Sequence, residues 1–240
     1  YHPENLLPNI RTVISLAVPY PAPSNTVPLL PTQGSIAAYA LFPDYHTLLK
    51  ERAESLALKI AQLIDQPLRH LVCVDTLPIL EKDYAQNSGL GWIAHNSCLT
   101  SETYGSWLVL CELLVDLSLM PDKPLSSSEC LDCHRCQMAC PTKAILPNRT
   151  IDARRCLSYL TIEHRGPIPL AFRPLIGKRI FGCYTCQSIC PSNRNVQPTT
   201  TFLGLSKVID PRPDLLESFQ LTEADFKTRY AGTPVLRARY

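Results

Sequence analysis

The chain has 240 residues, of which 45% are hydrophobic and 18% are charged, and its formal net charge is +2. This composition is typical of an ordinary globular protein and excludes a disordered or coiled-coil chain. The apolar runs are too short for a membrane-spanning helix, and no apolar signal-peptide stretch follows Tyr1. We therefore expect a cytoplasmic protein that makes no contact with membranes.

The first half of the chain alternates between strand-like and helix-like segments. Residues 12–18 are apolar and β-branched, which predicts a strand, and the Pro-, Ser- and Thr-rich residues 19–34 predict a loop. Asp44 is expected to cap a helix that runs to about Ile64, because the apolar residues after it fall on one helical face.

The pattern continues with two strands on either side of a shorter helix. Residues 70–74 predict a buried strand, and Thr76 is expected to cap a helix from 77 to about 88, which ends before Gly89. Residues 107–115 predict another strand. The alternation indicates a layered domain of helices on a sheet over residues 1–120.

Three further segments follow this predicted domain. Residues 121–128 have the composition of a linker, and residues 129–195 form a cysteine-rich module. The tail, residues 196–240, is polar and has one amphipathic patch over residues 215–226.

The cysteine module has the spacing of an iron–sulfur protein. Its two groups read Cys130-x2-Cys133-x2-Cys136-x3-Cys140-Pro141 and Cys183-x2-Cys186-x3-Cys190-Pro191. In two-cluster ferredoxins, the fourth cysteine of such a run binds the other cluster. The second group lacks a leading cysteine, and the upstream Cys156 is the obvious replacement. The spacing thus predicts one 4Fe-4S cluster on Cys130, Cys133, Cys136 and Cys190, and a second on Cys140, Cys156, Cys183 and Cys186.

Structural zinc is the alternative, since zinc sites also use Cys-x2-Cys pairs. Zinc ribbons, however, do not place three cysteines within seven residues before a Cys-Pro pair. The remaining cysteines, Cys73, Cys98 and Cys111, lie in apolar, strand-like context and are expected to be small core residues.

The module is also basic, with nine Lys or Arg against two Asp or Glu over residues 141–194. These charges either offset the anionic clusters or form a face that contacts phosphates. The run at issue is Arg149, Arg154, Arg155, Arg165, Arg173, Lys178 and Arg179.

Two adjacent clusters each carry one electron, which suits a wire or a two-electron reduction in single steps. The long segment before the cysteine module implies a second site that the clusters feed.

Several motifs across the chain resemble the epoxyqueuosine reductase family. They are residues 34–40 (GSIAAYA), 44–46 (DYH), 74–82 (VDTLPILEK), 89–93 (GLGWI), 105–107 (GSW), 152–163 (DARRCLSYLTIE), 165–169 (RGPIP) and 179–183 (RIFGC). The resemblance implies an α+β protein, with a nitroreductase-like cobalamin-binding domain followed by a ferredoxin-like module of two 4Fe-4S clusters.

The resemblance also implies a function. The family uses cobalamin and two 4Fe-4S clusters to reduce the epoxide of epoxyqueuosine in tRNA to queuosine. An external donor such as flavodoxin or ferredoxin is expected to supply the electrons, and the chain is expected to be a monomer. Family members often have a helical-repeat region that helps to hold tRNA, which lies outside these 240 residues.

The resemblance places the proton donor at Asp75 and the cobalamin contacts at Asp75, Leu99, Leu110 and Ser158. From local sequence alone, Asp75 could instead cap the following helix. An ordinary aspartate, with a pKa of about 3.9, is ionised at neutral pH. The pKa of a proton-donating Asp75 must therefore be raised by burial or by negative charge.

Two departures from the family pattern concern the cofactor. Ala38 stands where the family usually has an arginine that helps to bind cobalamin, and Ala94-His95 replaces Gly-Lys. His95 is a candidate lower ligand of cobalt, although a buried or exposed histidine of ordinary kind is the alternative.

Two other functions remain open at this point. The chain could be a relative that reduces another small substrate, in the manner of reductive dehalogenases, or a non-catalytic electron-transfer or cobalamin-binding module. A corrin absorption band and an assay on tRNA would distinguish the three.

Overall fold

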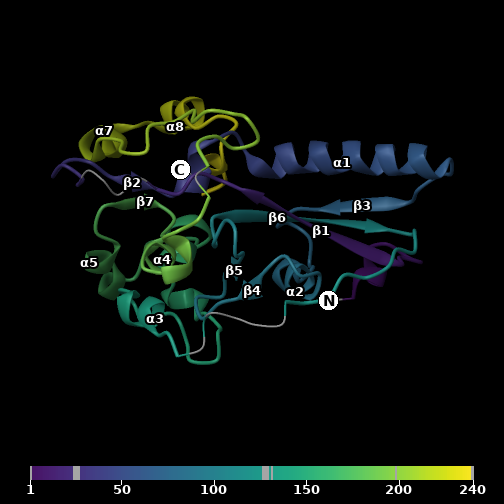
Figure 1. Cartoon of the computed structure of the whole chain (residues 1–240). Helices are drawn as coiled ribbons and strands as arrows, with labels where there is room; N and C mark the ends of the chain where they lie inside the picture. The colour runs from purple at the N-terminus through teal and green to yellow at the C-terminus, as the bar shows by residue number, and fades with distance from the viewer. Residues whose placement is uncertain (1, 24–27, 126–129, 131, 198, 239–240) are drawn as a thin grey trace.

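The computed structural model describes residues 2–23, 28–125, 130, 132–197 and 199–238. At its centre is an antiparallel sheet of three strands in the order β1–β6–β3 (Figure 1). The strands are β1 (Thr12–Pro19), β6 (Leu108–Val115) and β3 (His70–Cys73). All three were predicted from their β-branched and apolar runs, and the structure confirms them within one residue at each end.

Two helices cover opposite faces of this sheet (Figure 1). Helix α1 (Tyr45–Ile64) packs on β3 and β6, and α2 (Glu81–Asn87) packs on β1 and β6. Because side chains alternate along a strand, Leu113 of β6 joins the α1-side cluster, whereas Leu114 lies in the cluster on the other face. The predicted cap of α1 is confirmed, since the Asp44 carboxylate accepts the His46 N–H at 3.1 Å.

The prediction that a helix starts at residue 77, capped by Thr76, is wrong. Helix α2 begins at Glu81, and its N-cap is Leu80 without a side-chain hydrogen bond. Pro78 explains the delay, because a residue before proline is driven away from helical geometry. Residues 75–80 therefore form turns beside the sheet rather than the first turn of a helix.

Shorter elements make up the rest of the molecule. Strands β2 (Ser35–Ile36) and β7 (Arg179–Phe181) pair in parallel, and β4 (Trp92–Ile93) pairs with β5 (Leu99–Thr100). The described residues of the cysteine-rich segment include the α-helices α3 (Arg135–Ala139), α4 (Leu157–Ile162), α5 (Arg173–Ile176) and α6 (Thr185–Ser188). Helix α7 (Leu215–Gln220) falls in the predicted amphipathic patch, where Phe219 is 90% exposed, and α8 (Glu223–Arg229) begins in the patch and runs past its end.

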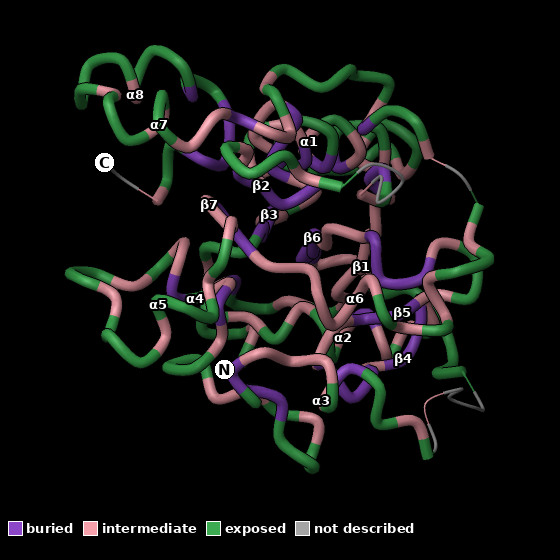
Figure 2. The backbone as a smooth tube through the Cα atoms, turned by 90° about the vertical axis from the view of Figure 1, so that its left-hand side faces the viewer, coloured by how far each residue is buried: buried purple, intermediate pink, exposed green. Residues whose placement is uncertain are grey.

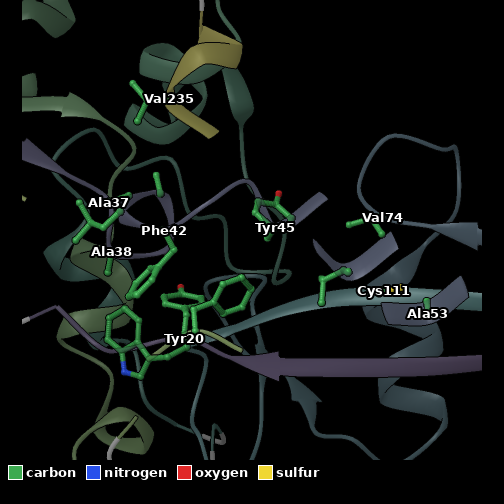
Figure 3. Close-up of a cluster of buried hydrophobic side chains, with 14 of the residues drawn as sticks. Tyr20, Ala37, Ala38, Phe42, Tyr45, Ala53, Val74, Cys111 and Val235 are labelled. Carbon is green, nitrogen blue, oxygen red and sulfur yellow. The ribbon is translucent and has the colours of Figure 1, made fainter. Parts of the chain in front are cut away.

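Buried backbone concentrates along the sheet and the segments next to it, whereas the outer helices are mostly exposed (Figure 2). The main hydrophobic cluster draws Tyr20, Phe42, Tyr45 and Val74 together with Val235 from near the end of the chain (Figure 3). Phe181 of β7 belongs to the same cluster. The layered part and the cysteine-rich part therefore share a strand pair and a core, although the boundaries at 120 and 129 remain predictions.

Parts of the predicted linker and loop, residues 126–128 and 24–27, lie outside the described residues. The architecture is thus mixed α/β. No described helix is both long and apolar enough to cross a membrane.

Candidate active site

Two adjoining cavities open beside the edge of the sheet. One, of about 450 Å³, lies between the sheet and the cysteine-rich segment, and the other, of about 870 Å³, extends towards the C-terminal residues. Both are lined by Tyr39, Tyr45, Asp75, Lys82 and Ser158. The shared residues join the two cavities into one candidate site.

The four residues predicted to contact cobalamin come together in the smaller cavity. Asp75 follows β3, Leu99 lies in β5, Leu110 in β6 and Ser158 in α4, and all four are lining residues. Four separate segments thus contribute to one lining, which contains both the apolar leucines and the polar Asp75 and Ser158. Their role in binding a cofactor remains a prediction.

Asp75 is held by neighbours from α1. The Tyr45 hydroxyl donates to Asp75 Oδ2 at 2.6 Å, and His46 Nε2 lies 3.7 Å from the same oxygen. Asp44 orients the His46 ring, because Asp44 Oδ1 lies 2.6 Å from His46 Nδ1, the ring nitrogen that does not face Asp75. The Asp75 side chain remains 61% exposed to the cavity. The alternative in which Asp75 caps a helix is wrong, since α2 begins six residues later and the carboxylate faces Tyr45 instead.

The electrostatics of Asp75 differ from the expectation of a raised pKa. The nearby His46 ring and, after the opposing effect of burial, the hydrogen bond from Tyr45 lower the pKa of Asp75. In turn, Asp44 and Asp75 raise the pKa of His46 against the effect of its burial. In the chain alone, Asp75 is therefore an ionised acceptor beside a histidine that gains a proton readily.

A second carboxyl group in the site has the opposite behaviour. Glu81, the first residue of α2, lines the smaller cavity, and its Oε1 accepts the backbone N–H of Asp75 at 2.6 Å. Burial raises the pKa of Glu81 to about 7. Lys82 beside it lines both cavities, and its Nζ donates to the Ser97 carbonyl at 2.9 Å.

Three cysteines of the second predicted cluster line the smaller cavity. Cys156, Cys183 and Cys186 are lining residues of the same space as Asp75. Cys156 directly precedes α4, which also carries Ser158, so one short helix presents a cluster cysteine and a cavity residue together.

The thiols of the module raise one another's pKa both within the predicted ligand sets and between them, since Cys136 also acts on Cys186. Burial first, and then the neighbouring Cys130, Cys190 and Cys133, raise the pKa of Cys136 to about 11. Burial also raises the pKa of Cys186, with Cys98, Cys183 and Cys156 adding to the effect. Helix α3, which carries Cys136, packs against α6, which carries Cys186. This proximity agrees with two neighbouring clusters, while the ligand sets themselves remain a prediction.

Backbone groups donate to two of the predicted ligands. The Ala144 N–H lies 3.3 Å from Cys140 Sγ, and the His95 N–H lies 3.3 Å from Cys130 Sγ. Such hydrogen bonds to cysteine sulfur are one means by which a protein sets the potential of an iron–sulfur cluster.

The other candidates are placed as follows. Cys73 and Cys111 are fully buried in the sheet, as expected of core residues, whereas Cys98 also lines the smaller cavity. His95 is buried outside the described lining of both cavities, with its ring 5.3 Å from that of His134. Ala38 is buried beside a third cavity of about 390 Å³.

Much of the basic run is anchored on backbone carbonyls rather than on carboxylates. Lys178 Nζ donates to the Leu30 carbonyl at 2.6 Å, and Arg173 Nε donates to the Ile168 carbonyl at 2.9 Å. Carbonyl partners leave the positive charge uncompensated. Lys178 and Arg179 line the third cavity together with Lys207 and Arg212, and its described lining contains no carboxylate.

Sequence reasoning assigned no role to Tyr45, His46, Glu81 or Lys82. All four lie in stretches that carry the family resemblance, which was the available signal. Tyr45 meets Asp75 from 30 residues away and Lys82 meets Ser97 from 15, so no local pattern could specify these contacts. Glu81 lies only six residues from Asp75, and its contact depends on the turn between them.

Two adjoining cavities lie against a cysteine module of this kind. The chain is therefore of the class of iron–sulfur proteins that have a substrate-sized site beside the clusters. A family model described as a 4Fe-4S double cluster binding domain matches residues 129–193, so the chain carries two 4Fe-4S sites rather than structural zinc. A model described as epoxyqueuosine reductase QueG, DUF1730, matches residues 1–76.

Curated relatives agree over nearly the whole chain. The epoxyqueuosine reductases of Salmonella typhimurium and Pseudomonas aeruginosa are 44% and 40% identical over 98% and 99% of this chain, and 62% and 66% of their own lengths. That of Xanthomonas campestris is 39% identical, over 98% of this chain and 67% of its own length. The chain belongs to the epoxyqueuosine reductase family and spans about two thirds of the length of these relatives.

Solved structures of the family have the same fold. The Streptococcus thermophilus epoxyqueuosine reductase superposes with a TM-score of 0.87 at 32% identity, over 98% of this chain and 64% of that one. An epoxyqueuosine reductase with an epoxyqueuosine-modified tRNA-Tyr stem loop gives 0.84 at 29% identity, over 98% and 65%. A Bacillus subtilis enzyme whose aspartate catalytic loop has swung out of the active site gives 0.85 at 28% identity, over 98% and 65%.

Proposed function

We propose that the chain is the catalytic part of an enzyme that reduces the epoxide of epoxyqueuosine in tRNA to queuosine. The observation that carries the proposal is a single cavity lined both by Asp75 and by the cluster cysteines Cys156, Cys183 and Cys186. Electrons that arrive at a cluster on those cysteines are delivered to the place where an acid could meet the substrate.

The reaction balances with what the site supplies. Removing the epoxide oxygen as water breaks two C–O bonds and consumes two electrons and two protons, leaving a carbon–carbon double bond. Each 4Fe-4S cluster carries one electron at a time. Two clusters in series therefore suit a two-electron reduction, fed from outside by a donor such as flavodoxin or ferredoxin.

Cobalamin is part of this proposal, in the nitroreductase-like domain that the family resemblance implies. The adjoining cavities of about 450 and 870 Å³ have room for a large flat ring, and Leu99 and Leu110 give it apolar contacts. Ser158 and Lys82 provide polar contacts at the junction of the two cavities. When bound there, cobalamin would supply redox chemistry at cobalt next to the substrate.

Asp75 is the proposed proton donor, and its turn is the proposed counterpart of the mobile aspartate loop of the Bacillus subtilis relative. Filling the cavity would remove water from a carboxyl group that is 61% exposed. That desolvation raises the pKa of an acid, against the lowering by His46 and Tyr45. His46, whose own pKa is raised, stands where it can return a proton to Asp75. Asp75, His46 and Tyr45 thus bring an acid, its proton source and a hydrogen-bond donor together.

Binding of tRNA draws on the basic residues of the cysteine-rich segment. Arg155 and Arg165 are exposed, and the carbonyl-bound Lys178 and Arg173 keep their positive charge. Phosphate contacts from such residues position a nucleic acid without reading its sequence. The chain is proposed to act as a monomer.

The test is direct. The chain, reconstituted anaerobically with iron, sulfide and cobalamin and given a strong reductant, should convert an epoxyqueuosine-containing anticodon stem loop to queuosine, detected by mass spectrometry. Omitting cobalamin should abolish the product. Full conversion without cobalamin would remove that cofactor from the proposal, and no conversion in any combination would overturn the proposed function.

A further inference from the structure

The backbone at Asp75 adopts a conformation that is uncommon for residues other than glycine. Its φ is +57°, in the left-handed region, which aspartate enters more readily than most residues but still at a cost in free energy. The Thr76 N–H donates to the Val74 carbonyl at 2.5 Å, which closes a tight three-residue turn around Asp75. A turn of this kind persists only where neighbouring groups hold it.

Two helices on opposite faces of the sheet hold this turn. From α1, the Tyr45 hydroxyl donates to the Asp75 carboxylate. From α2, Glu81 Oε1 accepts the Asp75 N–H at 2.6 Å. Helix α2 is itself fixed, because Ala85 is fully buried and the Gln86 side chain accepts the Ile93 N–H at 2.8 Å. Glu81 thus reaches from a fixed helix to the peptide group that sets the direction of the Asp75 side chain.

We propose that Glu81 is a positioning residue that latches the Asp75 turn into the cavity by accepting the backbone N–H of Asp75. The proposal rests on the proposed function, in which Asp75 is the proton donor. Without the latch, the strained turn relaxes and the carboxyl group moves away from the reacting atoms. Glu81 acts through Asp75 and is not itself assigned a contact with substrate.

The latch depends on pH. An ionised carboxylate accepts an N–H more strongly than a protonated acid, and burial raises the pKa of Glu81 to about 7. The latch therefore tightens as the pH rises through about 7. The titratable and charged groups that act on Glu81, or on which it acts, are Asp75, His46, Lys82, Cys73, Cys111 and Glu112.

The simpler explanation is that Glu81 only favours the N-terminus of α2, as acidic residues do in a first helical turn. Asp83 provides the control, because it lies in the same first turn and is exposed. A purely helical role would make Glu81 and Asp83 equivalent, whereas the latch belongs to Glu81 alone.

Hydrogen exchange of the chain loaded with its clusters tests the latch without any substrate. In Glu81→Ala, amide exchange in residues 75–80 should become at least about tenfold faster, because one protected N–H loses its acceptor. Exchange should stay near wild type in Glu81→Gln, whose amide oxygen can still accept, and in Asp83→Ala. Unchanged exchange in Glu81→Ala, or equal acceleration in Asp83→Ala, would overturn the proposal.

Turnover supplies the second readout. Glu81→Ala should lower kcat about tenfold with little change in KM, at wild-type iron and corrin content, because one positioning contact is lost. Glu81→Gln should recover most of kcat at pH 8 and lose the change in activity near pH 7. If kcat of Glu81→Gln still changed with pH near 7 as it does in the wild type, the result would contradict the latch. If the wild type lacks activity on epoxyqueuosine while the exchange result holds, the proposed function fails and the positioning role of Glu81 stands.

Discussion

The sheet region and the cysteine-rich segment differ in what holds them together. In β6, every residue from Cys111 to Val115 is buried, and α1 runs for 20 residues along that sheet. In the cysteine-rich segment, α3 has five residues and buries only Cys136, and α6 has four residues and buries none. Apolar packing therefore stabilises the sheet, whereas the cysteine loops depend on the clusters they bind, as small metal-binding modules do.

The two regions still meet in one site, and the difference has a functional use. The sheet and its helices fix Asp75 through Tyr45 and Glu81. The cysteine-rich segment attaches to the same core through the buried Phe181 and through Ile162, which packs against that cluster. The sheet region thus holds Asp75, the proposed acid, and the cysteine-rich segment holds the predicted cluster ligands that line the same cavity.

The largest expected effect on the difference between the two regions is that of Cys156→Ala. We expect iron to fall from about eight to about four per chain, with sulfide in proportion, because one 4Fe-4S cube loses a ligand. The far-ultraviolet circular dichroism spectrum of the chain should change little, because the sheet region does not depend on that cluster. Cys73→Ala, a buried cysteine of β3, is the control and should keep about eight irons. Full iron content in Cys156→Ala would show that the pairing through Cys156 is wrong.

The next test breaks the sheet instead. Leu113 is fully buried on the α1 face of β6, so Leu113→Ala should lower the free energy of unfolding by about 2–5 kcal/mol. Denaturant unfolding with the clusters intact measures this, and the exposed Leu58→Ala of α1 should change stability far less. A small loss in Leu113→Ala would mean that packing is not what holds the sheet.

The buried Glu112 of β6 makes the stability of the sheet region depend on pH. It is fully buried between Ser15 and Cys73 in neighbouring strands, and neither carboxylate oxygen has a hydrogen-bond partner among the described residues. Burial raises the pKa of Glu112 to about 8 from 4.5. A raised pKa of an acid means that its stabilising contribution is complete below about pH 4.5 and is lost as the pH rises through 8.

Unfolding of the wild type at pH 6 and pH 9 should therefore show a loss on the order of 2 kcal/mol from this group. Glu112→Gln, which keeps the shape of the neutral acid, should remove most of that difference. Glu51→Gln on the exposed side of α1 should leave it intact. An unchanged pH dependence in Glu112→Gln would assign the effect to another group.

The smallest effect concerns the basic face of the cysteine-rich segment. Binding of a tRNA stem loop should weaken with salt, and Arg155→Ala should reduce the log–log salt slope by about one if that side chain contacts a phosphate. The exposed Arg52→Ala of α1 should leave the slope unchanged. Salt-insensitive binding would count against phosphate contacts by this face.

The sequence predicted well the features that depend on local chemistry. The β-branched run at residues 12–18 and the Asp44 cap follow from neighbouring residues alone, and both are confirmed. The cysteine spacing likewise predicted a two-cluster module, which the family model bears out. Long-range contacts were beyond it. The contacts of Tyr45 and His46 that lower the pKa of Asp75 depend on how α1 packs on the sheet, whereas the late start of α2 reflects Pro78, a local signal that the sequence prediction overlooked.

The most direct measurement of the central claim is turnover in Asp75→Asn. Asparagine keeps the shape and can still accept from Tyr45, but it cannot donate a proton as an acid. With wild-type iron and corrin content, queuosine formation on the stem loop should fall by a factor of about 10² or more. Near-normal turnover in Asp75→Asn would contradict the account, because the reaction would then not require proton donation by Asp75.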